Sequence, residues 1–215
     1  MDERYKTVLS YGEDEFIVKK SRFIGYVKPI SNEKEALEFI EKIQAKHRDA
    51  THNVYAYITG QNANTQRFSD DGEPSGTAGV PALEVIKKEG LKDVVVVVTR
   101  YFGGVKLGGG GLIRAYTKGA KIGLEAARIV DMVLHRQVKF EVDYDQYGRI
   151  ENFLMNDGLL TNDVKFTDKV TIYIYIALSQ LERFKNEITN LTNGDAEIDE
   201  LDDLYLPMLK EKRLS

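Results

Sequence analysis

The run from Asp93 to Arg114 constrains the fold most, because it joins a strand, a glycine-rich turn and the start of a basic helix. Five consecutive valines, Val94–Val98, are β-branched and apolar on both faces, which predicts a strand covered above and below. Six of the nine residues in 103–111 are glycine, and glycine lets a ligand approach the main chain closely. Because a helix N-terminus attracts anions, the run predicts an anion site, with phosphate the favoured ligand.

The helix expected over residues 110–128 separates its cations from its small residues. Arg114, Lys118 and Lys121 are spaced i, i+4 and i+7, so they share one face. A basic face is often simply solvated, but here it adjoins the glycine-rich turn, which favours a role in binding. The small residues on the other side predict close contact with a sheet. They are Leu112, Ala115, Gly119, Gly123 and Ala126.

Charge is distributed unevenly along the chain. The net charge is −4, but residues 136–215 carry 10 Lys/Arg against 16 Asp/Glu, a balance of −6. Residues 87–128 carry nine Lys/Arg against three Asp/Glu, a balance of +6. The overall acidity therefore does not exclude nucleic-acid binding by the first part of the chain.

Several functional classes find no support in the sequence. The chain has no cysteine, which excludes disulfides, thiolate catalysis and cysteine-ligated zinc, and agrees with a cytoplasmic location. No apolar run approaches the roughly 20 residues of a membrane-spanning helix, and the N-terminus lacks the features of a signal peptide. The glycine-rich turn has glycines where a P-loop needs Lys and Ser or Thr, and Ile113 and Arg114 replace the third glycine of a dinucleotide fingerprint. We therefore expect no cofactor.

The first part of the chain predicts strands, helices and one long loop. Strands are expected over 15–19, 22–28 and 52–58, with a helix that Ser31 caps and that runs to His47. A polar connection over 61–79 precedes a helix over 78–88. Loops of this length in compact domains tend to be functional or disordered.

The pattern changes near residues 134–138, where the composition turns acidic. Strands over 138–144, 160–166, 170–178 and 196–206 alternate with helices over 146–156 and 179–191. The order βαββαβ is that of a ferredoxin-like domain. In 171–176 the isoleucines alternate with tyrosines, so the two kinds of side chain take opposite faces. We therefore expect two domains, 1–135 and 136–215.

The acidic loop offers weaker alternatives. Its carboxylates, in Asp70-Asp71-Gly72-Glu73, can hold a hard cation, but the same residues make a good turn, and we assign no metal. The three histidines lack the spacing of a metal site. Ser75, His52 and Asp70 contain the residue types of a hydrolase triad, which the sequence alone does not bring together.

Two motifs give the chain a family resemblance. Asp70-Asp71-Gly72-Glu73-Pro74-Ser75-Gly76-Thr77-Ala78-Gly79 and Val98-Thr99-Arg100-Tyr101-Phe102-Gly103-Gly104-Val105-Lys106-Leu107-Gly108 resemble those of the IMPACT family in its bacterial YigZ-like branch. The segment 52–57 resembles that family's histidine-containing strand. The resemblance is strong over residues 1–135. Beyond it, the βαββαβ segment is similar to the family's bacterial C-terminal domain, which is like a domain of elongation factor G.

The resemblance implies an α+β chain with two domains. The first is expected to be like domain 2 of ribosomal protein S5, and the second to be ferredoxin-like. It also implies a role in the regulation of translation, with RNA or the ribosome as partner and a translation-related protein as a further one. Eukaryotic relatives need an additional N-terminal domain for their kinase-pathway role, so we do not expect that role to carry over to this chain. The family has no established catalytic residues, so none is assigned here.

The leading hypothesis is a non-enzymatic RNA- or ribosome-associated protein. The residues predicted to bind nucleic acid or phosphate are Arg100, Tyr101, Phe102, Lys106, Gly108, Gly109, Gly110, Gly111, Arg114, Lys118 and Lys121. The alternatives are a small-molecule enzyme that uses the glycine-rich turn and loop 67–79, and a protein-interaction module. The loop residues without an assigned role are His52, Arg67, Asp70, Asp71, Glu73 and Ser75. The sequence does not fix the oligomeric state.

Overall fold

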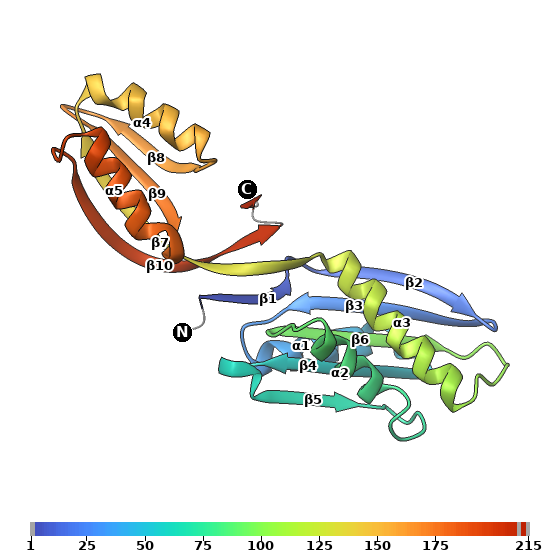
Figure 1. Ribbon diagram of the computed structural model, residues 1–215. Coiled ribbons are helices and arrows are strands. Elements are labelled where there is room, and N and C mark those ends of the chain that lie inside the picture. The colour runs from blue at the N-terminus through green and yellow to red at the C-terminus, as the bar shows by residue number, and fades with distance from the viewer. Residues whose placement is uncertain (1–2, 210–211, 214–215) are drawn as a thin grey trace. The chain divides into compact units, whose positions relative to one another are not determined.

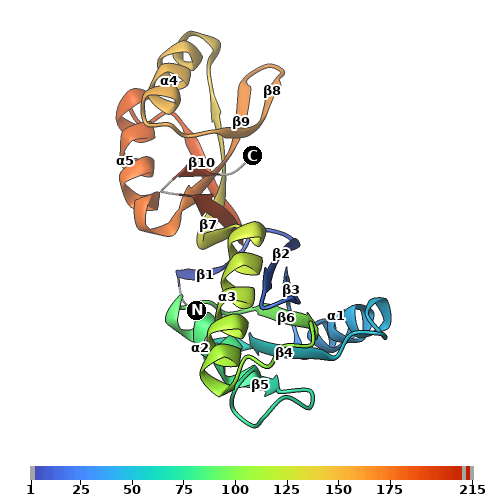
Figure 2. The same cartoon turned by 90° about the vertical axis from the view of Figure 1, so that its right-hand side faces the viewer.

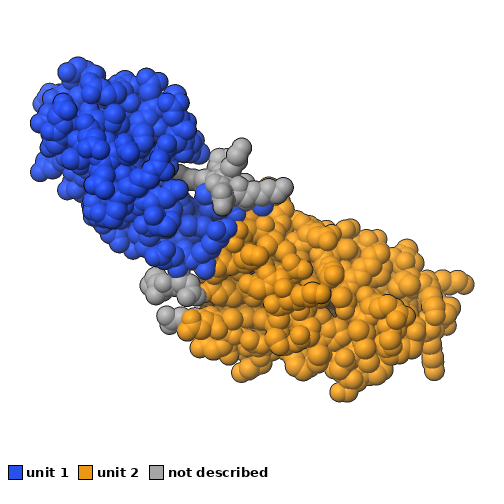
Figure 3. All heavy atoms as spheres, viewed as in Figure 1, with its two compact units in different colours: residues 1–4, 132–215 blue, residues 5–131 orange. Residues whose placement is uncertain are grey.

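The computed structural model describes residues 3–209 and 212–213. The chain forms two compact units (Figure 3). The first unit is Tyr5–Asp131, and the second combines the N-terminal residues up to Arg4 with the chain from Met132 onward. We call them the N-terminal and C-terminal units. No helix in the described part of the chain is both long and apolar enough to cross a membrane.

The N-terminal unit is built on a five-stranded sheet with the order β2-β3-β6-β4-β5 (Figure 1). All four neighbouring pairs are antiparallel. The strands are β2 (Gly12–Val18), β3 (Ser21–Pro29), β4 (His52–Thr59), β5 (Thr65–Ser69) and β6 (Val94–Tyr101). The valine strand lies in the centre, as its composition predicts.

Helices cover both faces of this sheet. Helices α2 (Gly79–Lys88) and α3 (Gly109–Ala127) lie on one face, and α1 (Glu33–Lys46) lies on the other (Figure 2). Val94, Val96 and Val98 pack into the core under α2 and α3, while Val95 and Val97 belong to the core under α1. All five valines are fully buried. The prediction of a strand covered on both sides is therefore confirmed.

Glycines bring α3 unusually close to the sheet. A Cβ atom on Gly119 would lie 2.7 Å from Cγ1 of Val98, and one on Gly25 of strand β3 would lie 2.0 Å from the carbonyl oxygen of Gly119. A Cβ on Gly123 would lie 2.8 Å from Cγ2 of Val27. The predicted close contact between the small residues of α3 and the sheet is confirmed at Gly119 and Gly123. Ala126 is the exception, because it is exposed.

Several sequence-based boundaries were wrong. The segment 61–79 contains a 3-10 turn (Gln61–Ala63) and the edge strand β5, so it is less irregular than its polar composition predicted. Helix α1 is capped by the side chain of Asn32, one residue after the predicted Ser31. Strand β1 (Arg4–Val8) was not predicted at all. Mixed polar sequences give weak strand signals at sheet edges, where pairing with a neighbour decides the structure.

The C-terminal unit has the element order βαββαβ. Its elements are β7 (Ile129–Val142), α4 (Tyr144–Asn156), β8 (Thr161–Phe166), β9 (Val170–Ala177), α5 (Leu181–Leu191) and β10 (Glu197–Leu209). A 3-10 turn (Leu178–Gln180) precedes α5, and a short strand β11 (Lys212–Arg213) pairs with β10. The sheet order β10-β7-β9-β8 is the ferredoxin-like arrangement, with β1 also paired to β7. The predicted α+β class is confirmed.

The alternating isoleucines and tyrosines of strand β9 decide which side of this strand faces the core of the C-terminal unit. Ile172, Ile174 and Ile176 are fully buried, while Tyr173 and Tyr175 are partly exposed. Strand β7 begins at Ile129 and is longer than the predicted strand over 138–144. It runs through residue 135, the position that the sequence indicated as the end of the first domain.

Candidate functional site

A row of side chains crosses the N-terminal sheet on the face that carries α2 and α3. Phe16, Phe23, Arg100 and His52 are direct cross-strand neighbours on β2, β3, β6 and β4. The rings of Phe16 and Phe23 stack with centroids 5.3 Å apart. The guanidinium carbon of Arg100 lies 5.5 Å from the Phe23 centroid. A cation thus sits beside aromatic rings at the end of the central strand.

The charge of Arg100 is compensated inside the protein. Its Nη1 donates a hydrogen bond of 2.5 Å to Oε1 of Glu73, and the hydroxyl of Tyr116 in α3 donates to the same oxygen at 2.8 Å. Arg100 is only 5% exposed and Glu73 only 7%. Burial, and then the Glu73 carboxylate, raise the pKa of Tyr116, which stays protonated. This cluster fastens the loop that carries Glu73 to both the sheet and α3.

His52 adjoins the same cluster. Its Nδ1 lies 2.7 Å from the carbonyl oxygen of Asp71. Because a carbonyl only accepts, Nδ1 carries a proton in this contact. Nε2 lies 3.8 Å from Oε1 of Glu73. The imidazole is therefore oriented by the loop, with its second nitrogen toward a carboxylate.

Two carboxylates of the acidic loop, those of Asp70 and Asp71, accept hydrogen bonds from backbone amides. Asp70 accepts hydrogen bonds from the amides of Gly76, Ala78 and Gly79, and so caps the start of α2. Asp71 accepts from the amide of Asn53 at 2.5 Å. Within residues 3–209 and 212–213, no group of three or more His, Cys, Asp or Glu side chains is placed to hold a metal ion. The hydrogen bonds of Asp70 and Asp71 hold the shape of this turn.

The other two loop positions lie at the surface. Ser75 is exposed. Arg67 is also exposed, on strand β5, with Nε 4.0 Å from a carboxylate oxygen of Glu33. Among the described residues, Ser75 makes no hydrogen bond to His52 or Asp70, so the residue types of a triad are not assembled around it.

The glycine-rich turn leaves its backbone open. Gly104 and Gly108 have φ values of 81° and 74°, and no atom would lie within 4 Å of a Cβ on either residue. Gly108 is the N-cap of α3 and supplies no side-chain cap. A Cβ on Gly109 would lie 4.0 Å from Thr77, which brings the acidic loop beside the start of α3. The first amides of α3 therefore face a surface without a capping side chain.

Cations begin at this helix terminus and continue along α3. Lys106, Arg114, Lys118 and Lys121 are all exposed, and none forms an ion pair with a carboxylate among the residues that the structure describes. Nη1 of Arg114 lies 3.6 Å from the position of a Cβ on Gly110, so the guanidinium folds back over the first turn of α3. Nζ of Lys118 lies 4.4 Å from the centroid of Phe16. We call these four side chains and the start of α3 the cationic face.

Two residues predicted for the surface lie elsewhere. Arg100 is buried and paired with Glu73, so it presents no free charge. Tyr101 packs against the core under α1, on the opposite face of the sheet from Arg100, because neighbouring residues in a strand point in opposite directions. Phe102, by contrast, is 48% exposed. The sequence did not single out Tyr116, although it lies one turn from Leu112 and Ala120 on the buried side of α3.

Tyr101 takes part in a separate network with His47. The hydroxyl of Tyr26 lies 2.6 Å from Nε2 of His47, and Nδ1 of His47 lies 2.8 Å from the hydroxyl of Tyr101. Tyr101 in turn donates to Asp49 at 3.1 Å. Burial, followed by the charge of Lys46, lowers the pKa of His47. This network ties the end of α1 to strand β6.

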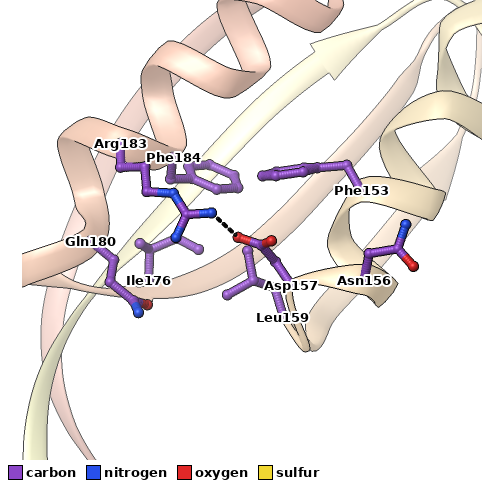
Figure 4. Close-up of a pocket in the computed structure, with 8 residues that line it drawn as sticks. All are labelled: Phe153, Asn156, Asp157, Leu159, Ile176, Gln180, Arg183 and Phe184. Carbon is purple, nitrogen blue, oxygen red and sulfur yellow. Dashed lines mark hydrogen bonds and ion pairs between the residues drawn. The ribbon is translucent and has the colours of Figure 1, made fainter.

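The C-terminal unit contains a shallow hollow between α4 and α5 (Figure 4). Its volume is about 310 Å³. Nη2 of Arg183 donates to Asp157 at 2.9 Å across the opening, and Phe153 and Phe184 form one wall. No residue that the sequence analysis assigned to a site lies here.

Comparison with known families divides the chain in two. The model of the Impact N-terminal domain matches residues 19–124. A domain of unknown function, DUF1949, matches residues 140–195. The first match contains both long motifs and the whole cationic face. The second covers most of the ferredoxin-like elements.

Individual relatives match over nearly the full chain. The IMPACT family member YvyE of Bacillus subtilis is 46% identical over 202 residues, which are 94% of this chain and 93% of the relative. The IMPACT family member YigZ of Escherichia coli is 31% identical over 184 residues, 84% of this chain and 90% of the relative. A crystal structure described as that of a hypothetical protein is similar, with a TM-score of 0.59, 26% identity and coverage of 94% of this chain and 99% of the other. On these matches, the chain belongs to the IMPACT family.

Proposed function

We propose that this protein binds RNA through the cationic face of its N-terminal unit. The observation that carries the proposal is the position of Arg114, folded over the first turn of an uncapped helix. A helix N-terminus and an adjacent guanidinium both favour phosphate. Lys106, Lys118 and Lys121 extend this charge beyond the helix terminus, which suits a polyanion with many phosphates.

The charge of the face is available for a partner. Its four cations lack carboxylate partners in the described part of the chain, while the acidic side chains nearby are occupied. Glu73 is paired with Arg100, and Asp70 accepts three backbone amides. The local potential is therefore positive in spite of the acidic overall charge.

A role in translation control, with the ribosome as partner, follows from the family resemblance and rests on this binding. Ribosomal RNA presents the phosphates that the cationic face would contact. A non-enzymatic role suits a loop in which Asp70 and Asp71 accept backbone amides and Glu73 pairs with Arg100. The experiments therefore measure binding to RNA first and binding to ribosomes second.

The test compares salt dependence in two matched triple variants. Fluorescence anisotropy measures binding of a labelled RNA at several salt concentrations to the wild type and to Arg114→Ala/Lys118→Ala/Lys121→Ala. The logarithm of the binding constant falls linearly with the logarithm of the salt concentration, and each lost phosphate contact on a single strand makes this slope shallower by about 0.7. Loss of three contacts should therefore make the slope shallower by about 2. The control is Lys34→Ala/Lys42→Ala/Arg48→Ala. It removes the same charges from exposed positions in and after α1, on the other face of the sheet.

The control variant should keep the affinity and slope of the wild type. Equal losses in both variants would mean that only total charge matters, and an unchanged slope in the α3 variant would remove the proposal. Thermal unfolding checks that both variants are folded. Co-sedimentation of the same proteins with ribosomes then tests the proposed partner.

A second function, a small-molecule enzyme, is favoured by one observation. His52 has its Nδ1 held by the loop and its Nε2 3.8 Å from the buried Glu73 carboxylate, an arrangement that orients an imidazole for proton transfer. Nucleotides and phosphosugars are the ligands to screen by thermal shift. A saturable shift that His52→Gln abolishes would favour the enzyme, and no shift with any of these ligands would count against it.

A further inference from the structure

We infer that the cationic face selects RNA with unpaired bases, and that the ring of Phe102 is the platform on which a base stacks. The inference rests on the proposed function and adds the class of RNA. It depends on three observations, which are the exposure of Phe102, the cation beneath its ring and the apolar residues between the cations.

Phe102 is held in place although it is exposed. Its ring is 48% exposed, and the guanidinium carbon of Arg100 lies 5.4 Å from the ring centroid. Arg100 itself is fixed by Glu73 and contacts Phe23. The amide of Phe102 donates to Oγ1 of Thr51 at 2.9 Å. A large apolar ring thus remains partly in water on a support of fixed side chains.

The platform and the helix that carries three of the cations share one buried anchor. Arg100, beneath the ring, contacts Glu73, and Glu73 accepts from Tyr116 of α3. Tyr116 lies two residues after Arg114 and two before Lys118. Phe102 and helix α3 are therefore both held by contacts to the buried pair Arg100 and Glu73.

Apolar side chains are interleaved with the cations. Val105, beside Lys106, is 41% exposed, and Ile113, beside Arg114, is 43% exposed. A duplex presents its phosphates and hides the faces of its bases, so it would leave Phe102, Val105 and Ile113 uncovered. A single strand presents both phosphates and bases, and proteins that bind single strands combine cations with aromatic platforms. The composition of this surface matches the single strand.

The experiment measures binding of two RNA probes to the full chain. One probe is a labelled unstructured 12-nucleotide RNA and the other is the same strand annealed to its complement. The proteins are the wild type, Phe102→Ala, Phe102→Trp and Phe166→Ala. Phe166 is a matched control because it is a 57% exposed phenylalanine in the C-terminal unit. Unfolding curves establish that each variant is folded.

We expect the wild type to prefer the single strand. Phe102→Ala should weaken single-strand binding by roughly 5- to 150-fold, the range for loss of one stacked base, and should leave duplex binding almost unchanged. Phe102→Trp should restore single-strand binding, and Phe166→Ala should have no effect.

The failures of the two proposals are distinguishable. Salt-dependent binding that is equal for both probes, or that is indifferent to Phe102→Ala, would overturn the stacking inference and leave the RNA-binding proposal intact. Absence of binding to either probe would overturn both.

Discussion

Nη1 of Arg100 and Oε1 of Glu73 lie 2.5 Å apart in the interior of the N-terminal unit, where they join strand β6 to the loop that precedes α2. The two residues are 27 positions apart in the chain. This pair explains why a loop rich in turn residues is ordered. It also places the motif loop against the helix that carries the cationic face.

Breaking this pair should destabilise the fold strongly. Glu73→Gln leaves the buried guanidinium of Arg100 without a counter-charge, and loss of one partner of a buried pair costs about 3–5 kcal/mol. Urea denaturation followed by circular dichroism measures the free energy of unfolding. Glu73→Gln/Arg100→Met should lose less than the sum of the two single variants, because the partners are coupled. A loss below about 1 kcal/mol for Glu73→Gln would contradict the prediction.

Asp70 should matter through the start of α2. Its carboxylate accepts from the amides of Gly76, Ala78 and Gly79, so Asp70→Ala leaves three donors without this partner. The expected loss in the free energy of unfolding is about 2 kcal/mol, the upper end for a helix cap. Asp70→Asn keeps one acceptor oxygen and should lose less. Equal losses in the two variants would show that charge, not acceptor geometry, is what the loop requires.

Two glycines of α3 should respond in opposite ways to alanine. A Cβ on Gly119 would lie 2.7 Å from Val98, whereas a Cβ on Gly110 would meet only the end of the Arg114 side chain, at 3.6 Å. Gly119→Ala should therefore lower the unfolding free energy by about 1–3 kcal/mol through overpacking. Gly110→Ala should raise it by up to about 1 kcal/mol, because alanine favours a helix. Thermal and urea melts measure both, and a stabilising Gly119→Ala would refute the close approach of helix and sheet.

Stability should depend on pH through His47. Its pKa is lowered in the folded chain from the usual 6.5, mainly by burial, so the folded chain binds this proton less tightly than the unfolded chain. As pH falls below about 6.5, the unfolded chain gains the proton first, and the free energy of unfolding decreases. The decrease ends once pH is below the folded pKa.

The measurement for His47 is a series of urea denaturation curves between pH 8 and pH 4.5. His47→Gln is neutral throughout this range, so the difference in unfolding free energy between wild type and variant should shrink as the solution is acidified. A difference that is constant with pH would show that His47 does not contribute to the pH dependence.

Local patterns in the sequence were enough to predict several elements of the fold. Five valines in a row need cover on both faces wherever they fold, and the alternation of Ile172 and Ile174 with Tyr173 decides which side of β9 is buried. The spacing of Arg114, Lys118 and Lys121 placed these cations on the exposed side of α3, because the period of a helix fixes which residues share a face. Short-range patterns of this kind need no knowledge of the partner strand.

Which cations remain available for a partner depends on long-range contacts in the fold. Arg100 and Lys106 are both cations within one short stretch of sequence. The fold pairs Arg100 with Glu73, whereas Lys106 has no carboxylate partner among the described residues. Strand direction likewise sends Tyr101 to the opposite face of the sheet from Arg100, while Phe102 stays in water. The formation of edge strand β5 and the role of Tyr116 also depend on contacts between residues that are far apart in the sequence. These features arise from contacts between residues that are far apart in the chain. A local sequence pattern does not show which distant residues will meet.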